Sequence, residues 1–92
     1  MQYLDLNRVF YDRTNNLHAP GRKFSGRKGK PDLTGIMPDG TGRYLGIEVK
    51  KPGEKQTPEQ VEFQREVEKR NGVYILVYSV QDVIDGLARE RR

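Results

Sequence analysis

Hydrophobic and polar positions along the chain follow two periods, and the shorter period predicts the strands. Alternating or β-branched runs of roughly four to eight residues are typical of strands. Such runs occupy residues 9–13, 32–37, 43–50 and 73–79. The turn residues PDGTG at 38–42 join the second and third runs into a hairpin. The last run is apolar at almost every position, which predicts a strand covered on both faces.

The longer period predicts two helices. Residues 57–60 read Thr-Pro-Glu-Gln, a capping box with proline at the first helical position, and predict a helix to about Arg70. Apolar residues at helical spacing after the last strand predict a second helix, capped by Ser79 or Asp82. The first helix is long enough for a crossover between parallel strands. We therefore predict an α/β fold, with a mixed sheet and flanking helices, in one domain over residues 1–92.

The composition limits the size of the core and excludes several kinds of site. Of the 92 residues, 34% are hydrophobic and 33% are charged, so the core is small and oligomerisation would supplement it. The absence of cysteine excludes disulfides, a thiolate nucleophile and any metal site that needs cysteine. With one histidine, a metal would be held mainly by oxygen, which favours magnesium, manganese or calcium. No segment is apolar over the length of a bilayer, so we expect a cytoplasmic protein with no membrane partner.

Positive charge is concentrated in the first third of the chain. The formal net charge is +4, and residues 1–31 carry seven cations against two acids, a net +5. Most of these cations lie in the glycine-rich stretch GRKFSGRKGK at 21–30, within an irregular loop predicted over 17–30. A basic loop suits the backbone of a nucleic acid, because neutralised phosphates release counterions. A solvated loop with surplus charge is the alternative.

The predicted strand at 43–50 carries the candidate chemistry. Alternation places Glu48 and Lys50 on one face, whereas Val49 and the other apolar residues point into the core. A carboxylate and an ammonium therefore share the non-core face. Gly46 lies on that same face and would leave space for another backbone or a ligand. The alternative for Glu48 and Lys50 is an exposed ion pair that contributes little to stability.

Asp32 begins the partner strand of the hairpin, so its carboxylate is expected beside that of Glu48. Two close carboxylates repel each other unless a cation lies between them. The Val49 carbonyl is available as a third oxygen. These groups therefore form a candidate site for a divalent metal.

Asp32 and Glu48-Val49-Lys50, with fifteen residues between the two acids, resemble the signature of the PD-(D/E)xK nucleases. More specifically, the chain is similar to the virus-type replication-repair nuclease (VRR-NUC) domain over residues 9–84. The motifs, in order, are RTNN at 13–16, GKPDLTG at 29–35, IEVK at 47–50, GEKQTPEQ at 53–60 and VYSVQDV at 77–83. The resemblance implies a restriction-endonuclease-like core and a phage or prophage endonuclease that acts in the bacterial cytoplasm. It also implies a homodimer that uses Mg²⁺ or Mn²⁺ to cut branched DNA such as four-way (Holliday) junctions.

Carried over by position, the resemblance assigns metal binding to Asp32, Glu48 and the Val49 carbonyl. It assigns catalysis to Asp32, Glu48, Lys50 and Gln60. Lys50 would orient or help deprotonate the attacking water, and the products would be a 5′-phosphate and a 3′-hydroxyl. Gln60 also has a structural role in the capping box. The residues expected to contact DNA are Arg13, Asn16, Arg22, Lys23, Arg27, Lys28, Lys30 and Lys51.

The sequence departs from the family at its N-terminal end and leaves other hypotheses open. The family's leading helix, which often carries a glutamate for the metal, has no match in residues 1–8. Asp5, Asp12 or a second subunit would supply that ligand, or the site uses fewer ligands, or this form of the domain is shortened. We expect His18 on the surface or against DNA, and Tyr74 and Tyr78 as packing residues. The competing functions are a nucleic-acid-binding module of the same fold without catalysis, and a small interaction protein whose charges are solvated.

Overall fold

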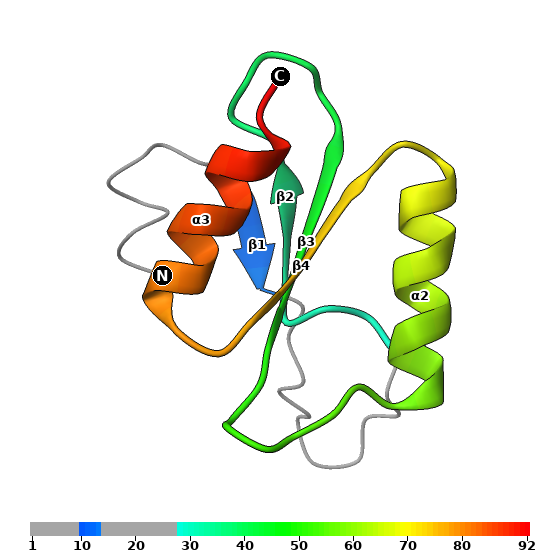
Figure 1. The fold of residues 1–92 in the computed structure, drawn as a ribbon. Coiled ribbons are helices and arrows are strands. Elements are labelled where there is room, and N and C mark those ends of the chain that lie inside the picture. Colours follow the sequence, from blue (N-terminus) through cyan, green and yellow to red (C-terminus); the bar gives the residue numbers. More distant parts are fainter. Residues whose placement is uncertain (1–9, 14–27) are drawn as a thin grey trace, which may run out of the picture.

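The computed structural model describes residues 10–13 and 28–92, which form a four-stranded mixed sheet with a helix on each face (Figure 1). The strands lie in the order β1-β2-β3-β4, and β3 pairs with β4 in parallel while the other pairs are antiparallel. The predicted α/β class, hairpin and crossover are confirmed. The elements are β1 Tyr11–Arg13, β2 Leu33–Ile36, β3 Tyr44–Val49, α2 Pro58–Lys69, β4 Val73–Val77 and α3 Val80–Glu90.

Both helices begin at the side-chain caps that the sequence indicates. Thr57 Oγ1 accepts a hydrogen bond from the Gln60 amide at 3.1 Å, and Gln60 Oε1 accepts one from the Thr57 amide at 2.9 Å. This reciprocal pair is the predicted capping box of α2. Ser79, rather than Asp82, caps α3, and its hydroxyl accepts a hydrogen bond from the Asp82 amide at 3.2 Å. Neither helix is long and apolar enough to cross a membrane, and the same holds for all of the described chain.

The apolar core lies between the sheet and α3. Ile75 of β4 packs against Gly86, where a Cβ atom would come within 2.7 Å of Ile75 Cγ2, so the helix approaches the sheet closely. One prediction for this face is wrong, because Val49 is 49% exposed. Leu33, the first residue of β2, pairs with Ile47, so Val49 of β3 lies beyond the start of β2. The core residues are Leu33, Met37, Leu45, Ile47, Val73, Ile75, Val77, Val83 and Leu87.

The opposite face of the sheet is covered by α2, and it is also buried although it carries charges. Glu48 is 3% exposed and Lys50 is 9% exposed, so an exposed ion pair on a solvated face is ruled out. The close approach predicted at Gly46 is present, but the group that approaches is the Pro31 ring and neither a backbone nor a ligand. A Cβ atom on Gly46 would lie 2.9 Å from Pro31 Cγ and 3.1 Å from Tyr44 Cε1. Pro31 is fully buried there, and it sets the position of Asp32 next to it.

The turn between β2 and β3 is tied to the end of α3, as the ribbon also shows (Figure 1). Arg43 Nη2 donates to Asp39 Oδ2 at 2.8 Å and to the Glu90 carbonyl at 2.6 Å. The Arg92 amide donates to Asp39 Oδ2 at 3.0 Å. Hydrogen bonds from Thr41, then from Arg92, hold the pKa of Asp39 well below its usual range. These contacts fix the far end of the hairpin that carries the candidate site.

Candidate functional site

The structure brings the carboxylates of Asp32 and Glu48 together. Leu33 pairs with Ile47 in the antiparallel ladder, so Asp32, one residue before β2, comes opposite Glu48. Asp32 Oδ2 accepts a hydrogen bond from the Val49 amide at 2.7 Å, which holds it at the end of β3. Burial raises the pKa of Glu48 to about 7, with a further contribution from the charge and hydrogen bonding of Asp32. The carboxylates of Asp32 and Glu48 therefore repel each other when both are ionised.

The backbone of Val49 faces this carboxylate pair. The Lys50 amide, and not that of Val49, donates to the Val77 carbonyl of β4 at 2.9 Å. In an extended strand the N–H and C=O of one residue point to the same side, so the Val49 carbonyl lies on the side of Asp32. Two carboxylates and a carbonyl are a set of oxygen donors that suits Mg²⁺ or Mn²⁺. A divalent cation would also relieve the repulsion between the acids, so the residues present fit such an ion.

Two neutral donors hold the two oxygens of Glu48. Gln60 Nε2 donates to Glu48 Oε2 at 3.1 Å, and the Tyr74 hydroxyl donates to Glu48 Oε1 at 3.2 Å. Because Gln60 also accepts from the Thr57 amide, its capping role and its contact with the site coexist. Burial, and then the negative charge of Glu48, raise the pKa of Tyr74 above its ordinary value, so its hydroxyl stays protonated and donates.

Sequence reasoning missed the role of Tyr74, which it treated as a packing residue. Tyr74 pairs with Gly46 in the parallel ladder and therefore shares a face with Glu48 on the neighbouring strand. Its hydroxyl also contacts the side chain of Gln56, which in turn donates to Gln64 Oε1 at 3.0 Å. The only signal in the sequence is residue parity within 73–79, and parity places Tyr74 beside Glu48 only once the register of β3 and β4 is known.

Lys50 completes the cluster with a largely buried side chain whose charge lies near Glu48. It follows β3 directly, and its charge partly offsets the rise in the pKa of Glu48. Among residues 10–13 and 28–92, its ammonium forms no ion pair within 4.0 Å and no hydrogen bond. The Lys50 ammonium is therefore available to bind a negatively charged ligand or a water molecule.

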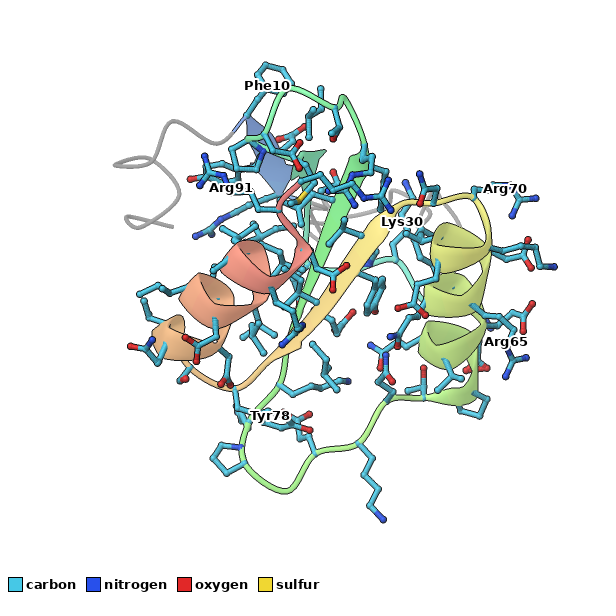
Figure 2. All side chains as sticks on the ribbon, turned by 45° about the horizontal axis from the view of Figure 1, so that its top comes forward. Phe10, Lys30, Arg65, Arg70, Tyr78 and Arg91 are labelled. Atoms are coloured by element: carbon cyan, nitrogen blue, oxygen red, sulfur yellow. The ribbon has the colours of Figure 1, made fainter. Side chains whose placement is uncertain are left out.

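Several of the residues expected to contact DNA lie at the same end of the sheet. Arg13 pairs with Leu33, which places it at the Asp32 end of β1. Lys28, Lys30 and Lys51 are exposed on the segments that lead into Asp32 and out of Lys50. Figure 2 shows Lys30 on the side of the sheet that faces α2. Asn16, Arg22, Lys23, Arg27, His18 and Asp5 lie outside the described residues.

The segment before Asp32 is packed against the first turn of α2. Gly29 has a φ of +86°, and a Cβ atom there would clash with the Glu59 carbonyl. Asp12, proposed as a substitute ligand, pairs with Thr34 of β2 and lies one strand further from β3. Within the part of the chain that the structure describes, no three acidic or histidine side chains gather around one point. The described site therefore has two carboxylates, and not three.

The chain has no match among models of protein families, curated proteins or solved structures. The site itself combines paired carboxylates, the ammonium of a largely buried lysine and neutral donors from β4 and α2. Figure 2 shows that Arg65 of α2 and Arg70, which caps its C-terminal end, point away from the sheet. The candidate site lies on the side of α2 that faces the sheet, where Gln60 in the first turn contacts Glu48.

Proposed function

We propose that this protein is a divalent-metal-dependent DNA endonuclease with a restriction-endonuclease-like core of the VRR-NUC type. The observation that carries the proposal is the meeting of Asp32 and Glu48 at the end of the hairpin, beside the largely buried side chain of Lys50. The resemblance of the motif order along the chain to that family, in which Asp32, Glu48 and Lys50 take part, also supports it. Mg²⁺ or Mn²⁺ bound here would supply Lewis acidity and neutralise charge on a phosphodiester.

Each residue of the cluster has a distinct part in this reaction. Asp32, Glu48 and the Val49 carbonyl would hold the cation, and Gln60 keeps one oxygen of Glu48 in place. Lys50 lies within a buried environment, where its charge orients the attacking water or stabilises negative charge on the phosphate. In-line displacement of the 3′-oxygen would leave a 5′-phosphate and a 3′-hydroxyl.

Exposed cations around the cluster support a nucleic acid as the substrate. Lys28, Lys30 and Lys51 are exposed on the segments next to Asp32 and Lys50, and Arg13 is exposed at the same end of the sheet, where these cations would neutralise phosphates near the reacting one. Branched DNA and a homodimer follow from the resemblance to the family. Two cuts across a symmetric junction would need two such sites, which a dimer provides.

The proposal is tested with labelled four-way junctions, flaps and linear duplex, incubated with and without Mg²⁺ or Mn²⁺. Asp32→Asn and Lys50→Ala are expected to lower metal-dependent cleavage by at least about 100-fold, because even partners outside the metal's own ligands cost 10–100-fold. Asp32→Asn keeps an oxygen that accepts from the Val49 amide and removes the repulsion with Glu48, so the fold should be retained.

The matched controls are Asp85→Asn on α3 and Lys55→Ala in the loop before α2, since both side chains are exposed and lie outside the cluster. These controls should cleave at the wild-type rate. Absence of metal-dependent cleavage on all three substrates, or equal cleavage by Asp32→Asn and wild type, would overturn the proposal.

A second candidate is a nucleic-acid-binding module of the same fold without catalysis. It is favoured by the presence of two, and not three, gathered metal-ligating side chains among the residues that the structure describes. It predicts that binding to DNA, measured by fluorescence anisotropy, weakens steeply between about 50 and 200 mM salt and is indifferent to divalent metal. Cleavage by the wild-type protein excludes this candidate.

A further inference from the structure

We propose that Tyr74 is a positioning residue, which fixes the orientation of Glu48 and thereby sets the affinity of the site for its cation. The inference rests on the proposed function, because it assumes that Glu48 is a metal ligand. The motif resemblance assigns nothing to Tyr74. Its role follows from the contacts of β4 with β3.

The carboxylate of Glu48 is held at both oxygens by donors from two different elements. Tyr74 of β4 donates to Oε1 at 3.2 Å, and Gln60 of α2 donates to Oε2 at 3.1 Å. Glu48 is buried, so water cannot replace either donor freely. With one donor on each side, the carboxylate cannot rotate about its terminal bond without losing both hydrogen bonds. The pair therefore selects one orientation of Glu48.

The side chain of Tyr74 is itself held in place by its burial and by a polar neighbour. It is buried within β4, and its hydroxyl contacts the side chain of Gln56. Gln56 is in turn held by Gln64 of α2 through a hydrogen bond of 3.0 Å. A continuous polar chain thus runs from α2 through the loop before it to Tyr74 and Glu48. Such a chain leaves Tyr74 little freedom to swing away from the carboxylate.

Tyr78 provides a comparison within the same chain. It follows β4 with the same parity as Tyr74, but its hydroxyl donates to the Glu54 carbonyl at 3.2 Å and its side chain is exposed. Figure 2 shows Tyr78 next to the loop that follows β3. Removal of the hydroxyl from Tyr78 therefore deletes a tyrosine hydrogen bond without touching Glu48. The difference between the two variants isolates the effect of orienting Glu48.

The experiment measures Mn²⁺ binding to the full chain by isothermal titration calorimetry, together with the Mn²⁺ concentration that half-saturates cleavage of a four-way junction. Partners that orient a metal ligand typically change metal affinity by 10–100-fold. We expect Tyr74→Phe to weaken Mn²⁺ binding by about that factor and to raise the half-saturating concentration in parallel. Tyr78→Phe should leave both quantities unchanged. Thermal unfolding without metal reports any loss of stability separately.

The outcomes separate this inference from the proposed function. Equal Mn²⁺ affinity for Tyr74→Phe and wild type overturns the positioning role alone, and so does a lower melting temperature with unchanged affinity. A wild-type protein that neither binds Mn²⁺ nor cleaves DNA overturns the proposed function and this inference with it. If Tyr74→Phe does not fold, Gln56→Ala decides, because it removes the partner behind Tyr74. A loss of Mn²⁺ affinity of several-fold supports the inference, and unchanged affinity overturns it.

Discussion

The two faces of the sheet are built from the same strands, yet they bury very different residues. Toward α3, the buried side chains of the strands are apolar, and they pack with Val83 and Leu87 of α3, where Gly86 is also buried. Toward α2, they present Glu48 and Tyr74, followed by Lys50, and no residue of α2 is buried. Strand alternation thus places the apolar core on one face and the candidate site on the other. A small chain can hold a core and a candidate site because the same strands contribute side chains to both faces of the sheet.

The comparison also shows how differently the two helices are attached. Helix α3 packs closely through Gly86, so hydrophobic burial holds it. Helix α2 contacts the sheet through half-buried side chains, such as Phe63 against the Tyr44 ring, and through the hydrogen bond from Gln60 to Glu48. We therefore expect substitutions on the two sides to separate stability from metal binding.

The largest effect on stability is expected on the α3 side. Leu87→Ala removes a buried leucine from the core and should lower the free energy of unfolding by about 2–5 kcal/mol. Urea denaturation monitored by circular dichroism measures it. At temperatures where the variant is folded, its Mn²⁺ affinity should equal that of wild type. Val80→Ala, at an exposed position of the same helix, serves as the control and should change stability by less than about 0.5 kcal/mol.

A loss of Mn²⁺ affinity in folded Leu87→Ala would contradict the separation of the two faces. It would mean that packing on the α3 side is transmitted through the sheet to the carboxylates. Equal stability of Leu87→Ala and Val80→Ala would contradict the assignment of the core to this side.

The next effect concerns pH and the buried carboxylate. Because the pKa of Glu48 is raised to about 7 in the folded protein from an ordinary 4.5, the folded state binds more protons than the unfolded state between these values. Without metal, stability should therefore fall as pH rises from 5 to 8, by up to about 3 kcal/mol. Glu48→Gln cannot ionise and should lack this contribution. Urea denaturation in EDTA at both pH values, for both proteins, measures the difference.

Divalent cations should reverse this trend, because they bind the ionised carboxylate. Added Mn²⁺ is expected to stabilise the wild-type protein more at pH 8 than at pH 5, and to have no such effect on Glu48→Gln. The same slope with pH for wild type and Glu48→Gln would show that Glu48 does not titrate in this range.

The smallest effect compares the caps of the two helices. Thr57→Ala and Ser79→Ala each remove one side-chain cap and should each cost about 1 kcal/mol of stability. Only Thr57 shares its capping box with Gln60, which contacts Glu48. Thr57→Ala should therefore also weaken Mn²⁺ binding by a few-fold, and Ser79→Ala should not. Equal Mn²⁺ affinity in the two variants would show that the start of α2 does not constrain the site.

Most of the fold could be predicted from periodicity and end signals. The hairpin, the crossover helix and both caps follow from local residue patterns, such as Thr57 with Gln60. The end of β3 and the exposure of Val49 could not be predicted in this way. They depend on where β2 begins opposite β3, which is a property of pairing between distant segments.

The candidate site divides in a similar way. The nearness of Asp32 and Glu48 was predicted because a hairpin register is short-range information. The burial of Lys50 could not be derived from the hairpin alone, and the contact of Tyr74 with Glu48 depends on the parallel register of β3 and β4. Both are long-range results of packing. Alternation within one strand cannot reveal them.

The packing of Pro31 over Gly46 has a consequence for related sequences. A Cβ atom on Gly46 would lie 2.9 Å from the Pro31 ring, so the sizes of these two residues are not independent. A larger residue at position 46 would push the ring, and with it the adjacent Asp32, away from β3. Positions 31 and 46 should therefore vary together in homologous chains, with a ring at one accompanied by glycine at the other.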